Sequence, residues 1–143
     1  MIADTLADSK KVSLLEKTKG RPVVVIFSFS KDAAAQVKAY GERAGKELGL
    51  DRLWQVPVLD GAPRLVRGLI LRGMRGDMPR ELYAQTLVLY QDGDLWKKRL
   101  RVTSDKHAYL VLLDKEGKIA WMHHGLFEEK KYEELRAAMA KVN

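Results

Sequence analysis

The stretch RPVVVIFSFSKDAAAQV, residues 21–37, decides the fold. Its first half is a continuous apolar run rich in valine, which is typical of a strand that is buried on both faces of a sheet. Ser30 and Asp32 then offer side chains that helix N-termini prefer, and apolar residues follow at helical spacing as far as Gly49. The stretch therefore predicts a central strand at Val23–Phe29 that runs into a helix.

The rest of the chain predicts further strands and helices around this unit. Leu53–Leu59 is a second strand, expected parallel to the first because a strand–helix–strand unit favours a right-handed crossover. The elements expected after it are a basic amphipathic helix at Pro63–Arg75, a helical turn from Pro79, a strand at Thr86–Tyr90, a short helix at Leu95–Val102, a hairpin of Tyr109–Asp114 and Lys118–His123, and a helix from Glu128.

Together these elements predict a single α/β domain over residues 1–143, with a polar lead-in segment at residues 1–20. The central strand is expected between Leu53–Leu59 and Tyr109–Asp114. The helices that begin near Lys31 and Glu128 are expected on opposite or adjoining faces of the sheet.

Composition excludes several classes of function. The chain has 143 residues, a net charge of +7 and no cysteine, so disulfides, thiolate nucleophiles and Cys-ligated metals are excluded. No glycine-rich phosphate-binding motif is present, and no cofactor is predicted. The first residues do not resemble a secretory signal. The protein is therefore expected in the cytoplasm, or exported or membrane-associated if a signal preceding Met1 was removed.

The order of the elements resembles that of the thioredoxin-like superfamily. The segment FSFSKDAAAQV lies where thioredoxins carry Cys-x-x-Cys, and those two positions fall on Asp32 and Ala35. The segment AYLVLLDKEGKIAW resembles the family's cis-proline strand and hairpin, with Ala108 or a neighbour in the place of the proline. The resemblance implies a three-layer sandwich, with a five-stranded mixed sheet flanked by helices and no thiol chemistry.

Three longer stretches resemble the mitochondrial assembly-factor family that chaperones the membrane-embedded proton-channel subunit of the ATP synthase. They are FSFSKDAAAQVKAYGE, VPVLDGAPRLVRGLILRGMRGDMPRELY and AYLVLLDKEGKIAW, and the resemblance spans Arg21 to Val142. It implies a non-redox protein that handles a partner.

The loop at Ser30, Lys31 and Asp32 is expected at the mouth of the fold, where the end of a strand meets a helix N-terminus and ligands often bind. A functional interpretation gives Asp32 an acid/base role and Lys31 a charge role. The simpler interpretation is that Ser30 or Asp32 caps the helix, since both residue types are preferred there. We therefore interpret this loop, with Ala35 and Ala108, as a vestigial active site without catalytic residues.

The chain has three histidines, His107, His123 and His124, which could suggest a metal site. Adjacent residues on a strand point to opposite faces, so one ion could not readily take both His123 and His124. Only His107 could join either of them. A structural or surface role is favoured, and no metal site is predicted.

The strongest functional signal is RLVRGLILRGMRG, residues 64–76. Helical spacing gathers four arginines and a leucine on one arc: Arg64, Arg67, Leu71, Arg72 and Arg75. Leu65, Val66, Leu69 and Ile70 fall on the opposite arc. One interpretation is a solvated basic face. The other is that the first arc contacts a membrane surface or an acidic, partly apolar partner, and it is our predicted partner-binding set.

The function favoured by these patterns is a non-catalytic chaperone or assembly factor for a membrane-protein complex, with an ATP synthase-like client. Its expected partners are a membrane-protein client or an acidic protein surface, with an anionic membrane surface as a further candidate. One alternative is an enzyme derived from thioredoxin-superfamily oxidoreductases that uses non-cysteine chemistry. The other is a basic nucleic-acid-binding domain, but aromatic residues are not interleaved with the basic helix, so no nucleic-acid partner is predicted.

Overall fold

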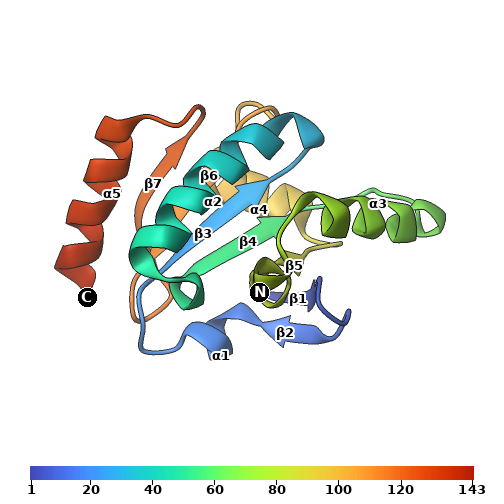
Figure 1. The fold of residues 1–143 in the computed structure, drawn as a ribbon, viewed down its shortest axis with the longest axis horizontal. Helices are drawn as coiled ribbons and strands as arrows, with labels where there is room; N and C mark the ends of the chain where they lie inside the picture. The colour runs from blue at the N-terminus through green and yellow to red at the C-terminus, as the bar shows by residue number, and fades with distance from the viewer.

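The computed structural model of the protein describes residues 1–143 (Figure 1). A four-stranded mixed sheet lies at its centre. Its strands, in order across the sheet, are β4 (Leu53–Pro57), β3 (Val23–Ser28), β6 (Tyr109–Leu113) and β7 (Ile119–His124). β3 pairs parallel with β4 and antiparallel with β6. The central place of β3, both of its expected neighbours and the β6–β7 hairpin are therefore confirmed.

A second, three-stranded sheet adjoins the first. It consists of β2 (Lys11–Ser13), β1 (Ile2–Thr5) and β5 (Leu87–Val88), in that order and all antiparallel. Isolated parallel bridges connect the β5 segment to the β4 segment, from Thr86 to Gln55 and from Leu89 to Val58. The expected single five-stranded sheet is thus corrected to one sheet of four strands and one of three.

The first twenty residues account for the additional strands. They form β1, β2 and helix α1 (Leu14–Thr18), not the polar lead-in that their composition predicts. Leu6 is fully buried, and its N–H donates to Thr86 O at 2.9 Å. Strands of four and three residues are too short to show a clear alternation of apolar and polar residues, so the sequence pattern does not reveal them.

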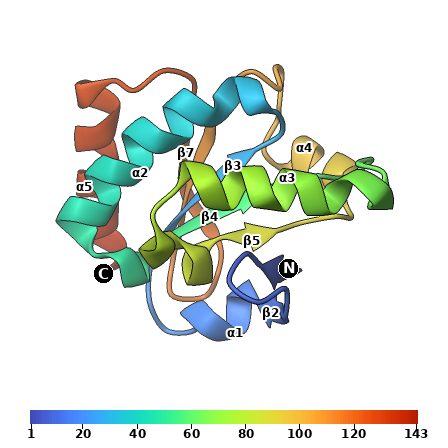
Figure 2. The ribbon, with the colours of Figure 1, turned by 45° about the vertical axis from the view of Figure 1, so that its right-hand side comes forward.

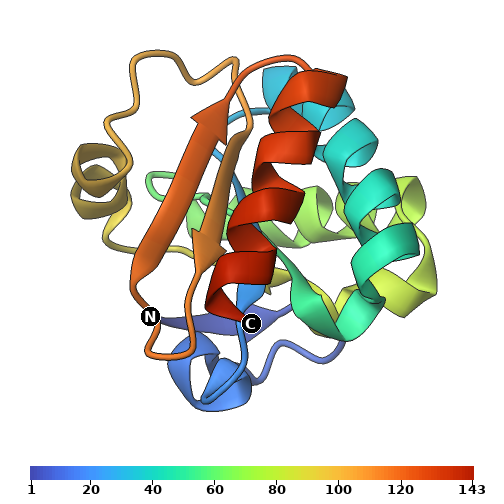
Figure 3. The same ribbon diagram turned by 90° about the vertical axis from the view of Figure 1, so that its left-hand side faces the viewer.

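Helices α2 (Ala34–Leu48) and α5 (Glu129–Val142) lie side by side on one face of the central sheet (Figures 1 and 3). They share one core cluster with β3, which includes Val24, Ile26, Tyr40, Ala44, Tyr132 and Leu135. Arg43 of α2 also pairs with both carboxylate oxygens of Glu129 of α5, each at 2.6 Å. The expectation of opposite or adjoining faces is therefore wrong, because β3 is apolar on both faces and its pattern cannot assign a helix to either.

The other face of the central sheet is covered by the N-terminal segment and by helix α4 (Gly93–Arg99). The core cluster on this side includes Ala3, Val23, Val25, Phe27, Trp54, Leu87, Leu100 and Val111. Trp96 of α4 stacks on Phe27 of β3, with ring centroids 5.1 Å apart. Helices therefore flank the sheet on both faces, as the sequence predicts.

Helix α3 (Arg64–Asp77) contributes no residue to either core cluster, and it is the only α-helix without a buried residue. It begins directly after Pro63, and the 3₁₀ helix η3 (Arg80–Gln85) follows Pro79. Figures 1 and 2 show α3 extending to one side of the molecule. The predicted basic helix is confirmed as an element, and no helix of the protein is long and apolar enough to cross a membrane.

Candidate functional site

Part of the basic arc of α3 faces the body of the protein. Arg67 Nε donates to Ala62 O at 3.2 Å, and the Arg67 guanidinium carbon lies 4.3 Å from the centroid of the Tyr90 ring. Arg75 Nε donates to Leu6 O at 3.0 Å. Arginine stems pack well against a protein body while their charged ends find acceptors. These two arginines therefore anchor α3 to the rest of the fold.

The five predicted partner-binding residues do not form one exposed face. Arg64 and Arg72 are exposed, whereas Arg67, Leu71 and Arg75 are half-buried. The expectation that Leu71 stands exposed among the arginines is therefore corrected. Only Arg64 and Arg72 of the set lie on open surface, since Arg67 and Arg75 contact the protein body and Leu71 is partly covered.

The apolar side of α3 is the side that faces solvent. Leu65 is 95% exposed and Leu69 is 67% exposed. Three glycines share this side, and a Cβ built on any of them would meet no atom within 4 Å. We call this surface the outer face of α3, formed by Leu65, Gly68, Leu69, Arg72, Gly73 and Gly76. No role is predicted for this face from the sequence, although the helical spacing of the glycines with the two leucines is a signal for it.

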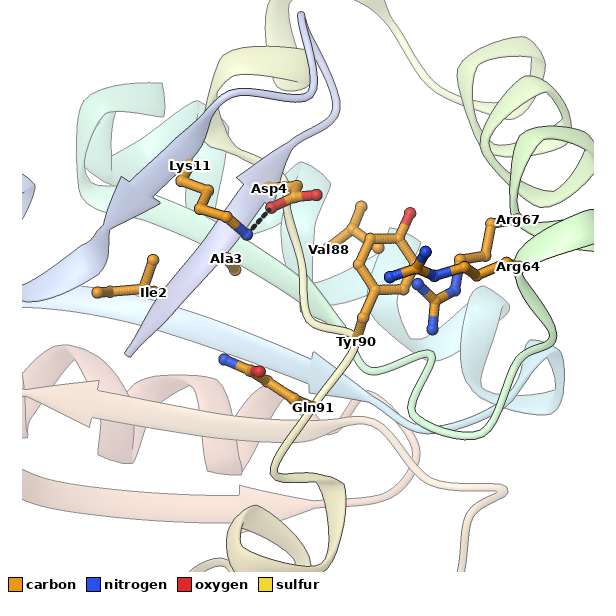
Figure 4. Close-up of a pocket in the computed structure, with 9 residues that line it drawn as sticks. All are labelled: Ile2, Ala3, Asp4, Lys11, Arg64, Arg67, Val88, Tyr90 and Gln91. Atoms are coloured by element: carbon orange, nitrogen blue, oxygen red, sulfur yellow. Dashed lines mark hydrogen bonds and ion pairs between the residues drawn. The ribbon is translucent and has the colours of Figure 1, made fainter.

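A hollow of about 560 Å³ lies between the start of α3 and strands β1 and β5 (Figure 4). We call it the α3 pocket and define it by Asp4, Lys11, Arg64, Arg67 and Tyr90. Lys11 Nζ lies 3.4 Å from Asp4 Oδ1, so the one acid in the pocket already has a cationic partner. Burial, and then the negative charge of Asp4, raise the pKa of the Tyr90 phenol above its ordinary value. Tyr90 therefore stays protonated near neutral pH and can donate a hydrogen bond.

The arginines of α3 have no carboxylate partner anywhere in the protein. The ion pairs of the chain all involve other residues, among them Arg21 with Asp51 and Arg43 with Glu129. The positive charge of α3 is therefore not offset by a neighbouring acid. Such a surface attracts anionic groups.

The predicted vestigial loop is fixed by backbone contacts. Ser30 Oγ accepts from Asp32 N at 3.2 Å, and the Ser30 hydroxyl donates to Asp105 O at 2.7 Å. Of the two expected caps, Ser30 is confirmed, and the Asp32 side chain has no capping hydrogen bond. Gln36 Oε1 accepts from Ala108 N at 2.7 Å and ties the helix to the start of β6. A hydroxyl that donates to a carbonyl has no general base to activate it as a nucleophile.

Comparison with solved structures decides the fold. The pneumococcal exposed lipoprotein thioredoxin Etrx1 from Streptococcus pneumoniae aligns with a TM-score of 0.66 at 19% identity, over 98% of both chains. The chain has a thioredoxin-like fold. The thioredoxin domain of a thiol-disulfide oxidoreductase from Bacteroides vulgatus aligns with a TM-score of 0.62 at 18% identity, over 100% of this chain and 93% of that one. No family model and no curated protein matches the sequence.

A third similar structure is BsSco, a member of the Sco family of cytochrome c oxidase assembly proteins. It aligns with a TM-score of 0.64 at 15% identity, over 98% of this chain and 91% of that one. At such identities the similarity shows the fold alone. The thioredoxin-like chain differs from proteins with thiol chemistry in one decisive respect, because it contains no cysteine to form the attacking thiolate.

Two of the three histidines meet near the mouth of the thioredoxin-like fold. His107 Nδ1 lies 2.9 Å from His124 Nδ1, and His124 stacks on Tyr109 with ring centroids 5.1 Å apart. The His123 ring lies 6.1 Å from the Tyr40 ring and 6.2 Å from the His124 ring, measured between centroids. No group of three His, Cys, Asp or Glu residues is placed to hold a metal ion.

His123 predicts a pH dependence of stability. Burial lowers the pKa of His123 below its ordinary value, and Glu128, whose carboxylate lies 3.8 Å away, raises it only in part. A histidine with a lowered pKa binds its proton more readily in the unfolded chain, so the free energy of unfolding should fall as the pH drops below about 6.5. Above that pH the contribution of neutral His123 to the free energy of unfolding is fully present.

This dependence can be measured by urea denaturation at about pH 7.5 and pH 5.5. The variant His123→Gln, which cannot titrate, should show a smaller loss of stability between these pH values than the wild type. The variant His124→Gln is the matched control on the same strand. Equal losses in the two variants would contradict the role of His123.

Proposed function

We propose that this protein is a non-redox, thioredoxin-like chaperone or assembly factor for a membrane-protein complex, with an ATP synthase-like client. The outer face of α3 carries the proposal, because Leu65 and Leu69 stand in solvent on a helix that extends from the fold. Burying apolar surface contributes roughly 25 cal/mol per Å², and exposed apolar patches commonly mark interaction sites. Arg72, which lies on the outer face with the leucines, suits a partner with both apolar and anionic surface.

The lack of cysteine and the sequence resemblance support this proposal. The stretch from Val56 to Tyr83, which resembles the ATP synthase assembly-factor family, is the one that folds into α3 and η3. BsSco, which has a similar fold, is named as a member of a family of cytochrome c oxidase assembly proteins. A thioredoxin-like fold is therefore compatible with a role in assembly.

The outer face can be tested with paired leucine variants. The double variant Leu65→Ser/Leu69→Ser is expected to weaken client binding about a hundredfold or more, since each buried leucine contributes about 1.5–3 kcal/mol. The control Leu95→Ser/Leu126→Ser changes two leucines that are 44% and 74% exposed on other surfaces. The readout is the amount of assembled membrane complex on native gels, in cells that lack the gene and are complemented with each form.

Wild type and control are expected to restore the assembled complex, and the outer-face variant is not. Crosslinking from position 69 in the same membranes should identify subunits of the complex. Full restoration by a normally folded outer-face variant would contradict the proposal. So would a set of crosslinked partners without any subunit of a membrane complex.

A further inference from the structure

We propose that the α3 pocket is a binding site for a phosphate group, carried either by a soluble phosphate ester or by a lipid headgroup. This inference goes beyond the client role and does not rest on it, because the pocket lies on the side of α3 that faces the protein body. Its chemistry follows from three features: the two arginines that line it, the contact of Arg67 with the Tyr90 ring, and the pairing of its single acid with a lysine.

Arg64 and Arg67 supply the positive charge. They lie three residues apart in the first turn of α3, so their side chains leave the helix on the same side. Figure 4 shows both side chains extending from α3 toward the Tyr90 side of the pocket that they line. Neither has a carboxylate partner. Two adjacent unpaired guanidinium groups repel each other, and an oxyanion between them would remove that repulsion.

Arg67 is already held in position for such a ligand. Its Nε donates to Ala62 O at 3.2 Å, and its guanidinium carbon lies 4.3 Å from the centroid of the Tyr90 ring. These contacts use one of its five N–H donors and one face of the group, so both terminal nitrogens remain available. A side chain that is fixed before binding loses less conformational entropy when the ligand arrives.

The other groups in the pocket do not oppose an anion. Asp4 is the only acid that lines it, and Lys11 Nζ lies 3.4 Å from its Oδ1. Tyr90, whose hydroxyl is protonated near neutral pH, and Gln91 add neutral hydrogen-bonding groups. With Arg64, Arg67 and Lys11 against Asp4, the pocket carries a net positive charge. Its volume, about 560 Å³, lies within the range of small-molecule sites.

The first experiment is calorimetric titration of the purified full chain with inorganic phosphate at low ionic strength. Wild type is expected to bind phosphate saturably. Arg64→Gln/Arg67→Gln should bind at least about tenfold more weakly, because two charge-assisted contacts are lost. The matched control Arg72→Gln/Arg80→Gln removes the same charge from exposed positions outside the pocket and should stay within about twofold of wild type.

The second experiment distinguishes the two sources of the phosphate. It measures co-sedimentation with vesicles of phosphatidylglycerol in phosphatidylcholine and with vesicles of phosphatidylcholine alone. If the ligand is a lipid headgroup, the pocket variant should lose binding to the anionic vesicles more than the control does, and inorganic phosphate should compete. If the ligand is a soluble ester, both variants should bind the vesicles equally. Neither experiment involves the client, so a negative result in the complementation test of the proposed function would not affect either of them.

Three outcomes would overturn the proposal. The first is that wild type shows no saturable binding of phosphate. The second is that the pocket variant and the control variant weaken binding equally, which would mean that phosphate is attracted by the overall positive charge and not by the pocket. The third outcome is a loss of binding that is only structural, which must be considered because Arg67→Gln also removes a contact that anchors α3. Arg64→Gln alone breaks no hydrogen bond of the protein, so it should weaken phosphate binding severalfold with an unchanged circular dichroism spectrum. An effect of the double variant without any effect of Arg64→Gln would mean that the loss is structural.

Discussion

Replacing Leu6 with alanine is expected to lower the free energy of unfolding by about 2–5 kcal/mol. Leu6 has no exposed surface, and its backbone joins two elements. Its N–H donates to Thr86 O at 2.9 Å, and its carbonyl accepts from Arg75 Nε at 3.0 Å. A cavity at this point would therefore form where β1, the β5 segment and α3 meet. The measurement is urea denaturation of wild type and variant under identical conditions.

The N-terminal segment contains its own control for this prediction. Leu15 lies in α1 and is 55% exposed, so Leu15→Ala should change the free energy of unfolding by less than about 1 kcal/mol. Both substitutions shorten a leucine to alanine within the first twenty residues, so they differ only in how deeply the leucine is buried. If Leu6→Ala cost no more than Leu15→Ala, the N-terminal segment would not be the integral part of the fold that the structure shows.

The sequence predicts best the elements whose pattern has a single explanation. The run Val23–Phe29 has no polar alternation, so a place in the middle of a sheet is the only one that buries it. The turn between Asp114 and Gly117 separates two apolar segments and predicts the hairpin. By contrast, β1 and β2 have four and three residues; β1 is held by pairing with β5, and β2 by pairing with β1, rather than by a pattern of their own.

The candidate site shows a different limit of sequence reasoning. Helical periodicity separates an arginine-rich arc of α3 from an apolar arc, but it groups Arg72 with the first, although Arg72 lies with Leu65 and Leu69 on the exposed outer face. It does not say which side meets the protein, since an arginine can pack when a carbonyl and an aromatic ring receive it. Ala62 O and the Tyr90 ring do this for Arg67. Their positions depend on the distant pairing of β5 with β1, which the sequence does not indicate.

The helix cap near the mouth of the fold illustrates a smaller ambiguity. Ser30 and Asp32 are both residue types that cap helices, so residue type alone cannot choose between them. The structure selects Ser30 because its extended backbone, with φ of −160°, places Oγ against the N–H of Asp32. Asp32 instead lies within the first helical turn, where its side chain is exposed.

Placing cysteines at Asp32 and Ala35 is expected to give this chain the thiol chemistry that it lacks. The double variant Asp32→Cys/Ala35→Cys recreates Cys-x-x-Cys at the positions that the resemblance to thioredoxins indicates. A thiol in the first turn of a helix has a lowered pKa, because the free backbone N–H groups there stabilise the thiolate. The variant should form an intramolecular disulfide and catalyse the reduction of insulin by dithiothreitol, whereas wild type should show only the uncatalysed rate.

The matched control is Ala35→Cys/Lys38→Cys, which keeps the spacing of the two thiols but moves the pair one turn into α2. All three positions are exposed, so access to the substrate is comparable. Only the first pair places a thiol at residue 32, ahead of α2 and directly after the capping Ser30, so it should react at least about tenfold faster than the control at pH 7. Equal rates would mean that Asp32 and Ala35 do not occupy the reactive position of the thioredoxin fold. A faster first pair would show that the loop capped by Ser30 holds the geometry that thiol chemistry requires.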